Sequence, residues 1–211
     1  MRKCLAPWHS ILVRFNGDIV PDGVYRKRYG NVLESPLNTV LNSITASHTR
    51  ESFIQGHLPP ECESCALKEA SVGHSRRKFF KDILNPMLEN TNYSYTKTFN
   101  DIMFLEFNMS NICNLKCRMC NGISSSAWVK DELKLAKMNK DFQRPVDNPE
   151  FGYTNKSEQI IERLFEDPTP FKNLRYLSIK GGEPYMEPAN KTILKKFIDL
   201  GVAKHVTLDW T

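Results

Sequence analysis

The sequence predicts an α/β fold, with a parallel sheet in the second half of the chain and a small α+β unit before it. After residue 97, expected strands and helices alternate, an order typical of parallel sheets with right-handed crossovers. The first half instead carries a hairpin signal and short helices. Between the halves runs the polar stretch "ENTNYSYTKT", a linker signal. We therefore expect two domains, at residues 1–96 and 97–211.

The first half begins with a small β element. "SILVRFNGDIV" alternates apolar and polar residues up to Asn16-Gly17, a dipeptide favoured in tight hairpin turns. Ser35-Pro36 should cap and begin a short helix whose apolar residues, Leu37 to Ile44, recur at helical spacing. A later helix has an apolar side from Phe79 to Leu88, and we expect Pro86 to kink or end it.

The second half alternates three strands with helices. "DIMFLEFNM", "LRYLSIK" and "HVTLDW" are the expected strands, and residues 126–138, 157–166 and 189–200 are the expected helices. Ligands of such sheets bind where the loops gather at the carboxyl ends of the strands. Residues in the loops after these strands are therefore candidates for function.

Composition narrows the function classes. The chain has 211 residues and a net charge of +5, and its basic clusters, Arg26 to Arg28 and Arg76 to Lys81, are expected to solvate a surface. Nucleic-acid binding is not expected. The start is a poor signal peptide, and no apolar run is long enough to span a membrane. We expect a cytoplasmic protein whose six cysteines are reduced thiols with a metal or redox role.

Two motifs follow neighbouring strands of the predicted parallel sheet. "NICNLKCRMCNG" places Cys113, Cys117 and Cys120 after the first strand, and "GGEP" follows the second. Three thiolates on a short loop suit an iron-sulfur cluster or zinc. A structural zinc site needs four ligands, and the nearest histidines, His74 and His205, are read as ordinary residues. A cubane held by three cysteines leaves one iron open to a small molecule.

At these residues the chain resembles the radical S-adenosylmethionine (radical SAM) enzymes. "CNLKCRMC" has the CxxxCxxC spacing of that family, and "GGEP" recurs at the second strand as in the family. The resemblance covers about residues 99 to 211 and implies a partial parallel (βα) barrel. It also implies that Cys113, Cys117 and Cys120 hold a 4Fe-4S cluster. The cluster's open iron would chelate S-adenosylmethionine and reductively cleave it to a 5'-deoxyadenosyl radical.

The resemblance also assigns cofactor contacts around S-adenosylmethionine. It implies that Gly181, Gly182, Glu183 and Pro184 bind its amino group, with the glycines allowing close backbone approach. Read alone, "GGEP" favours an ordinary turn from strand to helix over a cofactor site. The family usually has an aromatic residue beside the adenine where this chain has Met119, whose thioether can still pack on a flat ring.

The N-terminal cysteines resemble those of the SPASM and twitch domains, which bind auxiliary clusters in many radical SAM enzymes. Cys4 opens the pattern, and "CESC" supplies Cys62 and Cys65. Where the pattern has its second cysteine, this chain has Asp22. An auxiliary 4Fe-4S cluster would then have Asp22 as an oxygen ligand or an open iron. A zinc ion held by the three cysteines, with Asp22 or a histidine, is the alternative.

Two function classes follow. The first is a radical SAM enzyme that abstracts hydrogen from a substrate, for which a peptide or protein is expected, with an electron donor such as flavodoxin or ferredoxin. The second is a non-catalytic iron-sulfur or zinc module for electron transfer or structure. The family barrel has more strands than the three expected in residues 97–211. We therefore expect the chain to be an incomplete enzyme that holds its cluster better than S-adenosylmethionine.

Overall fold

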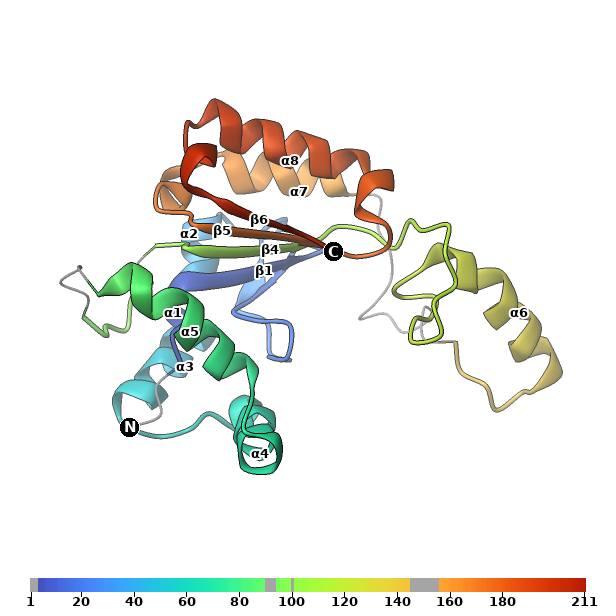
Figure 1. Ribbon diagram of the computed structural model, residues 1–211, viewed down its shortest axis with the longest axis horizontal. Coiled ribbons are helices and arrows are strands. Elements are labelled where there is room, and N and C mark those ends of the chain that lie inside the picture. Colours follow the sequence, from blue (N-terminus) through green and yellow to red (C-terminus); the bar gives the residue numbers. More distant parts are fainter. Residues whose placement is uncertain (1–3, 90–93, 100, 145–155) are drawn as a thin grey trace.

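A single six-stranded sheet runs through the protein (Figure 1). The computed structural model describes residues 4–89, 94–99, 101–144 and 156–211, so residues 90–93 of the predicted linker lie outside the described residues. The strand order is β3-β2-β1-β4-β5-β6. The strands are β1 (Ser10–Arg14), β2 (Asp18–Val20), β3 (Gly30–Asn31), β4 (Phe104–Asn108), β5 (Tyr176–Lys180) and β6 (Thr207–Trp210).

The sheet is mixed, which confirms the α/β class and refines the expected parallel sheet. Strands β4, β5 and β6 are parallel as expected, with Glu106 opposite Ser178 and Ser178 opposite Asp209. Strands β1, β2 and β3 are antiparallel to one another, consistent with the hairpin signal. Strand β1 lies parallel to β4, with Leu12 opposite Glu106. The two predicted segments therefore share one sheet, and a domain boundary at residue 97 stays a prediction.

Helices cover both faces of the sheet. The described helices are α1 (Ala6–His9), α2 (Leu37–Leu41), α3 (Ile44–Ile54), α4 (Glu63–Val72), α5 (Arg76–Leu88), α6 (Val129–Met138), α7 (Ser157–Phe165) and α8 (Pro188–Asp199). Figure 1 shows α7 and α8 on one side of the sheet and α1, α3 and α5 on the other. In the part of the chain that the structure describes, no helix is both long and apolar enough to cross a membrane.

The two sides of the sheet have different cores. Successive strand residues point to opposite faces, so Leu105 and Ile179 pack in one cluster with Ile193 of α8. On the opposite face Phe104 stacks on Tyr176, with ring centroids 4.8 Å apart, and meets Phe80 of α5 edge-on at 5.0 Å. Helix α5 therefore fastens the N-terminal segment onto strands of the parallel sheet.

The structure corrects details of the helices predicted in the first half. The apolar run from Leu37 to Ile44 covers all of α2 and the first residue of α3, because Ser43 caps α3 by accepting from Ala46 N–H at 3.3 Å. Ile44 is consequently 78 % exposed. Pro36 is the residue before α2 and not its first residue. Pro86 lies inside α5, which continues to Leu88, so the expectation that Pro86 ends the helix is wrong. A kink at Pro86, the other expected outcome, stays a prediction.

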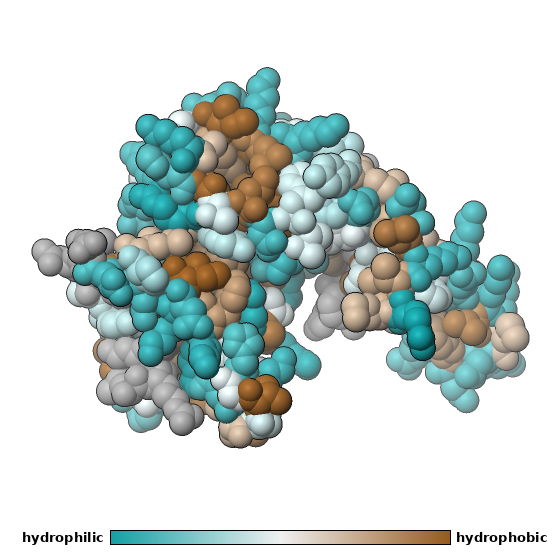
Figure 2. All heavy atoms as spheres, in the orientation of Figure 1, coloured by the Kyte–Doolittle hydropathy of each residue, from teal (hydrophilic) through white to brown (hydrophobic). Residues whose placement is uncertain are grey.

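An arm made of the loop after β4 and helix α6 extends away from the sheet (Figure 1). The arm covers residues 109–144. Figure 2 shows it as a projection with mixed hydrophilic and hydrophobic spheres, separated by a hollow from the N-terminal part of the molecule. The arm carries the second cysteine motif, so its attachment to the sheet decides where that motif lies.

Candidate metal centres

The second cysteine motif lies at the base of the arm, in a loop that begins directly after β4. We call residues 109–125 the cysteine loop. All three of its thiols are free; Cys117 is exposed, and Cys113 and Cys120 are half-buried. The loop is closed by the turn before α6, since Ser126 Oγ accepts from Cys113 N–H and donates to Cys113 O, both at 3.1 Å. The thiols are thus held on a fixed backbone and accessible to solvent.

Two further side chains from the α6 region support the cysteine loop, and sequence reasoning missed both. Trp128 Nε1 donates to Cys117 O at 3.2 Å. Glu132 is only 4 % exposed, and its Oε1 accepts from Gly122 N–H at 2.6 Å. A carboxylate in the first turn of a helix also interacts favourably with the helix dipole. Acidic residues are common in the first turn of a helix. The available sequence signal for Glu132 was therefore its position shortly after the three cysteines.

The "GGEP" motif packs directly against the cysteine loop. Gly181 and Gly182 have φ angles of +95° and +48°, which favour glycine. A Cβ on Gly181 would lie 2.8 Å from Ser110 O, and one on Gly182 would lie 2.8 Å from the carbonyl carbon of Asn111 and collide with Ile112 O. Glu183 N–H donates to Ile112 O at 2.7 Å. The glycines therefore permit a close approach of two backbone segments, one of which leads into the cysteines.

Other predicted cofactor residues lie nearby with defined contacts. Glu183 Oε1 accepts from Tyr185 N–H at 3.3 Å, and Pro184 is buried at the start of the 3-10 helix Pro184–Met186. "GGEP" is thus also the strand-to-helix turn between β5 and α8. Met119 is 93 % exposed. Contacts of these residues to S-adenosylmethionine stay predictions.

The three N-terminal cysteines come together although they are distant in the sequence. Cys4, Cys62 and Cys65 line one pocket, together with Asp22. We call this the thiol pocket. Cys4 and Cys65 are buried and Cys62 is half-buried. Cys4 lies before α1, Asp22 follows β2, Cys62 ends the 3-10 helix Pro60–Cys62, and Cys65 belongs to α4, so this grouping depends on the tertiary fold.

Burial makes the thiol form the favoured state in this pocket. Desolvation, strengthened by the neighbouring Cys65, raises the pKa of Cys62 to about 12. Burial also raises the pKa of Cys4 well above its ordinary value. Buried thiolates are therefore costly unless a positive centre binds them, and metal binding would release protons. This donor set fits a soft metal centre better than it fits free thiolates.

Asp22 is buried in the thiol pocket and already has partners for both carboxylate oxygens. Its Oδ1 accepts from Val24 N–H at 2.8 Å, and its Oδ2 accepts from Arg76 Nε at 2.7 Å. The first contact is an Asx turn, the ordinary local role of Asp. A ligand role for Asp22 stays a prediction, and it would require at least one of these contacts to change.

Two arginines that the sequence placed on a solvated surface line the thiol pocket instead. Arg77 is 6 % exposed and binds Glu69 through two contacts, at 2.9 and 2.5 Å. Arg76 packs on Phe79, with its guanidinium 4.4 Å from the ring centroid. The expectation of a solvated basic cluster is therefore wrong for these two residues. Their neighbours Phe79 and Phe80 were the available signal that this helix end is half-buried.

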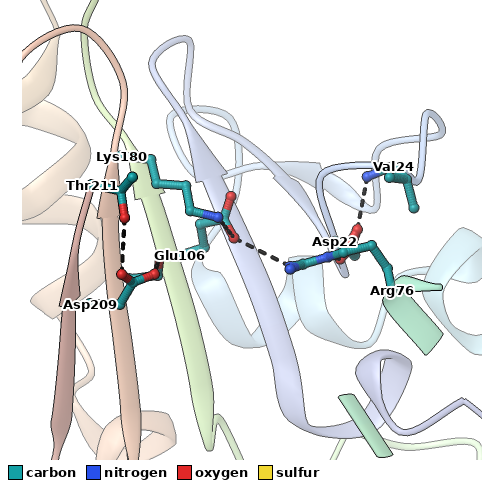
Figure 3. Close-up of polar contacts among 8 residues, drawn as sticks. Asp22, Val24, Arg76, Glu106, Lys180, Asp209 and Thr211 are labelled. Carbon is teal, nitrogen blue, oxygen red and sulfur yellow. Dashed lines mark hydrogen bonds and ion pairs between the residues drawn. The ribbon is translucent and has the colours of Figure 1, made fainter. Parts of the chain in front are cut away.

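A row of charged and polar groups connects the thiol pocket with the carboxyl end of the sheet (Figure 3). Arg76 Nη2 reaches Glu106 Oε2 of β4 at 3.4 Å, and Lys180 Nζ reaches the same oxygen at 3.2 Å. Lys180 directly precedes Gly181. Further along the face, Asp209 accepts from Ser178 Oγ at 2.9 Å. The motif search did not single out Glu106, because one carboxylate within a strand has no characteristic spacing.

The cysteines are not grouped as ligands of one metal ion. Within the described residues, which include all six cysteines, no three His, Cys, Asp or Glu side chains are placed to hold a single ion.

Comparison with known proteins supports the N-terminal site. Residues 4–66 match the family model of SPASM, an iron-sulfur cluster-binding domain that is typical of radical SAM proteins. The match covers less than a third of the chain and includes Cys4, Asp22, Cys62 and Cys65. No curated protein and no solved structure matches the chain. Iron-sulfur binding is thus supported for the first segment by a domain family.

Proposed function

We propose that this protein is a radical SAM enzyme with an N-terminal auxiliary cluster, and that β4, β5 and β6 belong to a partial barrel. The observation that carries the proposal is the packing of "GGEP" on the cysteine loop. The two motifs are separated by more than 60 residues in the sequence, yet Glu183 N–H donates to Ile112 O, next to Cys113. A sulfur-rich loop and a close-packed glycine turn at one sheet edge are what a ligand-binding cluster needs.

In the cysteine loop, Cys113, Cys117 and Cys120 would hold the 4Fe-4S cluster. When bound, this cluster supplies the electron and the open iron for reductive cleavage of S-adenosylmethionine. The chain positions the thiols through Ser126, Trp128 and Glu132, and solvent access to Cys117 leaves room for a cofactor. Met119, Gly181, Gly182, Glu183 and Pro184 are proposed to line the cofactor, with the Glu183 carboxylate accepting from its ammonium group.

In the thiol pocket, Cys4, Cys62 and Cys65 would hold the auxiliary 4Fe-4S cluster. The SPASM match, to an iron-sulfur cluster-binding domain, favours a cluster over a single zinc ion. Asp22 is the candidate for a fourth ligand. If it is one, Asp22→Ala should change the spectrum of this cluster and Asp22→Cys should preserve cluster binding. Unchanged spectra in both variants would reduce Asp22 to a turn residue.

The proposed setting is the cytoplasm, where reduced thiols and a flavodoxin or ferredoxin donor are found. A peptide or protein is the proposed substrate class. The second candidate is a non-catalytic electron-transfer module, favoured by the low exposure of the thiol pocket, which suits a buried redox centre. The two candidates differ in whether S-adenosylmethionine is consumed.

The test is cleavage by the anaerobically reconstituted chain. With dithionite and S-adenosylmethionine, it should form 5'-deoxyadenosine, measured by liquid chromatography and mass spectrometry. Replacing Cys113, Cys117 and Cys120 by alanine should abolish the product. Arg118→Ala, an exposed change between Cys117 and Cys120, is the matched control and should retain it.

A cluster-loaded protein that forms no 5'-deoxyadenosine would overturn the enzymatic proposal and favour the electron-transfer module. Stoichiometric zinc with no uptake of iron would overturn both iron-sulfur sites. Product formation by the triple alanine variant would show that the cysteine loop is not the site of cleavage.

A further inference from the structure

Arg76 has contacts that no local role explains. It lines the thiol pocket, and it is held there by the Asp22 carboxylate at 2.7 Å and by the faces of Phe79 and Phe80. Its Nη2 contacts Glu106 of β4, a buried residue that does not line the pocket. One guanidinium therefore joins a pocket residue to a residue of the parallel sheet (Figure 3).

Glu106 extends this connection toward the second cysteine site. The same Oε2 that meets Arg76 also accepts from Lys180, at the carboxyl end of β5. Lys180 is followed by Gly181 and Gly182, which pack on the backbone that leads to Cys113. A continuous series of contacts thus runs from the thiol pocket to the cysteine loop.

We propose that Arg76 is a positioning residue that couples the thiol pocket electrostatically to the parallel sheet, by holding Asp22 with one edge and Glu106 with the other. This inference rests on the proposed cluster in the thiol pocket. A fixed positive charge beside a buried cluster favours its reduced, more negative state, and the neighbouring carboxylates oppose this effect. Glu106 should then influence the cluster through Arg76, although Glu106 does not line the pocket.

Arg77 is the matched control that separates coupling from simple charge. It lines the same pocket, but its carboxylate partner, Glu69, lies on α4 and not on the sheet. Removal of either arginine should lower the reduction potential of the N-terminal cluster. Only removal of Arg76 should reduce the influence of Glu106 by more than half.

The experiment uses the reconstituted full chain in which the three cysteines of the cysteine loop are alanine, so that only the N-terminal cluster is observed. Its reduction potential is measured by a redox titration monitored by electron paramagnetic resonance. Arg76→Gln and Arg77→Gln should each lower the ratio of reduced to oxidised cluster about tenfold at fixed solution potential, or about 59 mV.

The decisive variants test Glu106. Glu106→Gln should raise the potential when Arg76 is present, and its effect should fall by more than half in the Arg76→Gln background. Asp209→Asn, on the same face but without a contact to Arg76 among the described residues, should leave the potential unchanged. If Arg76→Gln fails to fold, Arg76→Lys keeps the charge and should weaken the Glu106 effect.

The outcomes separate two failures. Absence of iron in the N-terminal pocket of the parent chain would overturn the proposed auxiliary cluster. Iron that is bound normally, with a Glu106→Gln effect that is absent or equal in both backgrounds, would overturn the coupling role of Arg76 alone.

Discussion

The thiol pocket and the cysteine loop use the same number of cysteines in opposite surroundings. In the pocket, thiols from distant segments are buried beside two arginines that are themselves paired with carboxylates. In the loop, thiols from one short segment lie on an arm and remain accessible. The difference indicates separate tasks, because a buried cluster suits electron transfer or structure and an accessible one suits a ligand.

The two sites also differ in what holds them. The pocket depends on tertiary packing, since Arg76, Arg77 and Phe80 of α5 form part of its lining. The loop depends on backbone contacts to "GGEP" and on a few side chains near α6. A substitution that weakens the contacts of one site should therefore reduce iron binding at that site and leave iron binding at the other site unchanged.

The largest effect is expected from Gly182→Ala. The new Cβ would collide with the backbone at Ile112, and φ is positive, so we expect a loss of more than about 3 kcal/mol in the free energy of unfolding. Folded protein should also lose the iron of the cysteine loop and retain that of the thiol pocket. Thermal unfolding and iron analysis measure both effects.

Gly201→Ala is the control for this prediction. Gly201 also has a positive φ, of +71°, but its Cβ would meet nothing within 4 Å. Only the backbone cost of about 1 to 2 kcal/mol should appear, with iron unchanged. Equal losses of iron in the two variants would show that the contact at Ile112 is not what holds the loop.

The second largest effect is expected in the rates at which thiols of the two sites react with an alkylating reagent. In the metal-free protein, iodoacetamide should modify Cys117 about a hundredfold faster than Cys4 or Cys65, because buried thiols react only after local opening. Peptide mass spectrometry over time gives the rates. Rates within a few-fold of one another would contradict the closed pocket described here.

A smaller effect is expected from Glu132→Ala. This change removes the buried acceptor of Gly122 N–H and should cost about 1 to 3 kcal/mol. It should also loosen iron binding in the cysteine loop. Glu132→Gln keeps an acceptor oxygen and should cost less. Lys130→Gln, an exposed change on α6, should leave the unfolding temperature and the iron content close to those of the parent.

Much of this architecture was predictable because its signals are local. Alternating strands such as "LRYLSIK" and the spacing of Cys113, Cys117 and Cys120 are properties of short segments. The α/β class and the parallel pairing of β4, β5 and β6 are confirmed. The pairing of β1 with β4 was not predicted, because register between distant strands is set by tertiary packing.

The residues around the sites were harder to predict than the cysteines. Arg76 and Arg77 lie in a basic cluster that reads as surface, and only the packing of α5 buries them beside thiols. The role of Gly182 was predicted as a close approach to a ligand. In the structure its close neighbour is the backbone at Ile112, a contact that no spacing in the sequence encodes.

We propose that the chain holds two iron-sulfur clusters of different accessibility, one in the thiol pocket and one in the cysteine loop. The most direct measurement is iron and sulfide analysis with Mössbauer spectroscopy of three anaerobically reconstituted proteins: the parent, the triple alanine variant of the cysteine loop, and that of the thiol pocket. The parent should hold about eight irons as two 4Fe-4S clusters, and each variant about half of that. About four irons in the parent, or the loss of all iron from either variant, would contradict the claim.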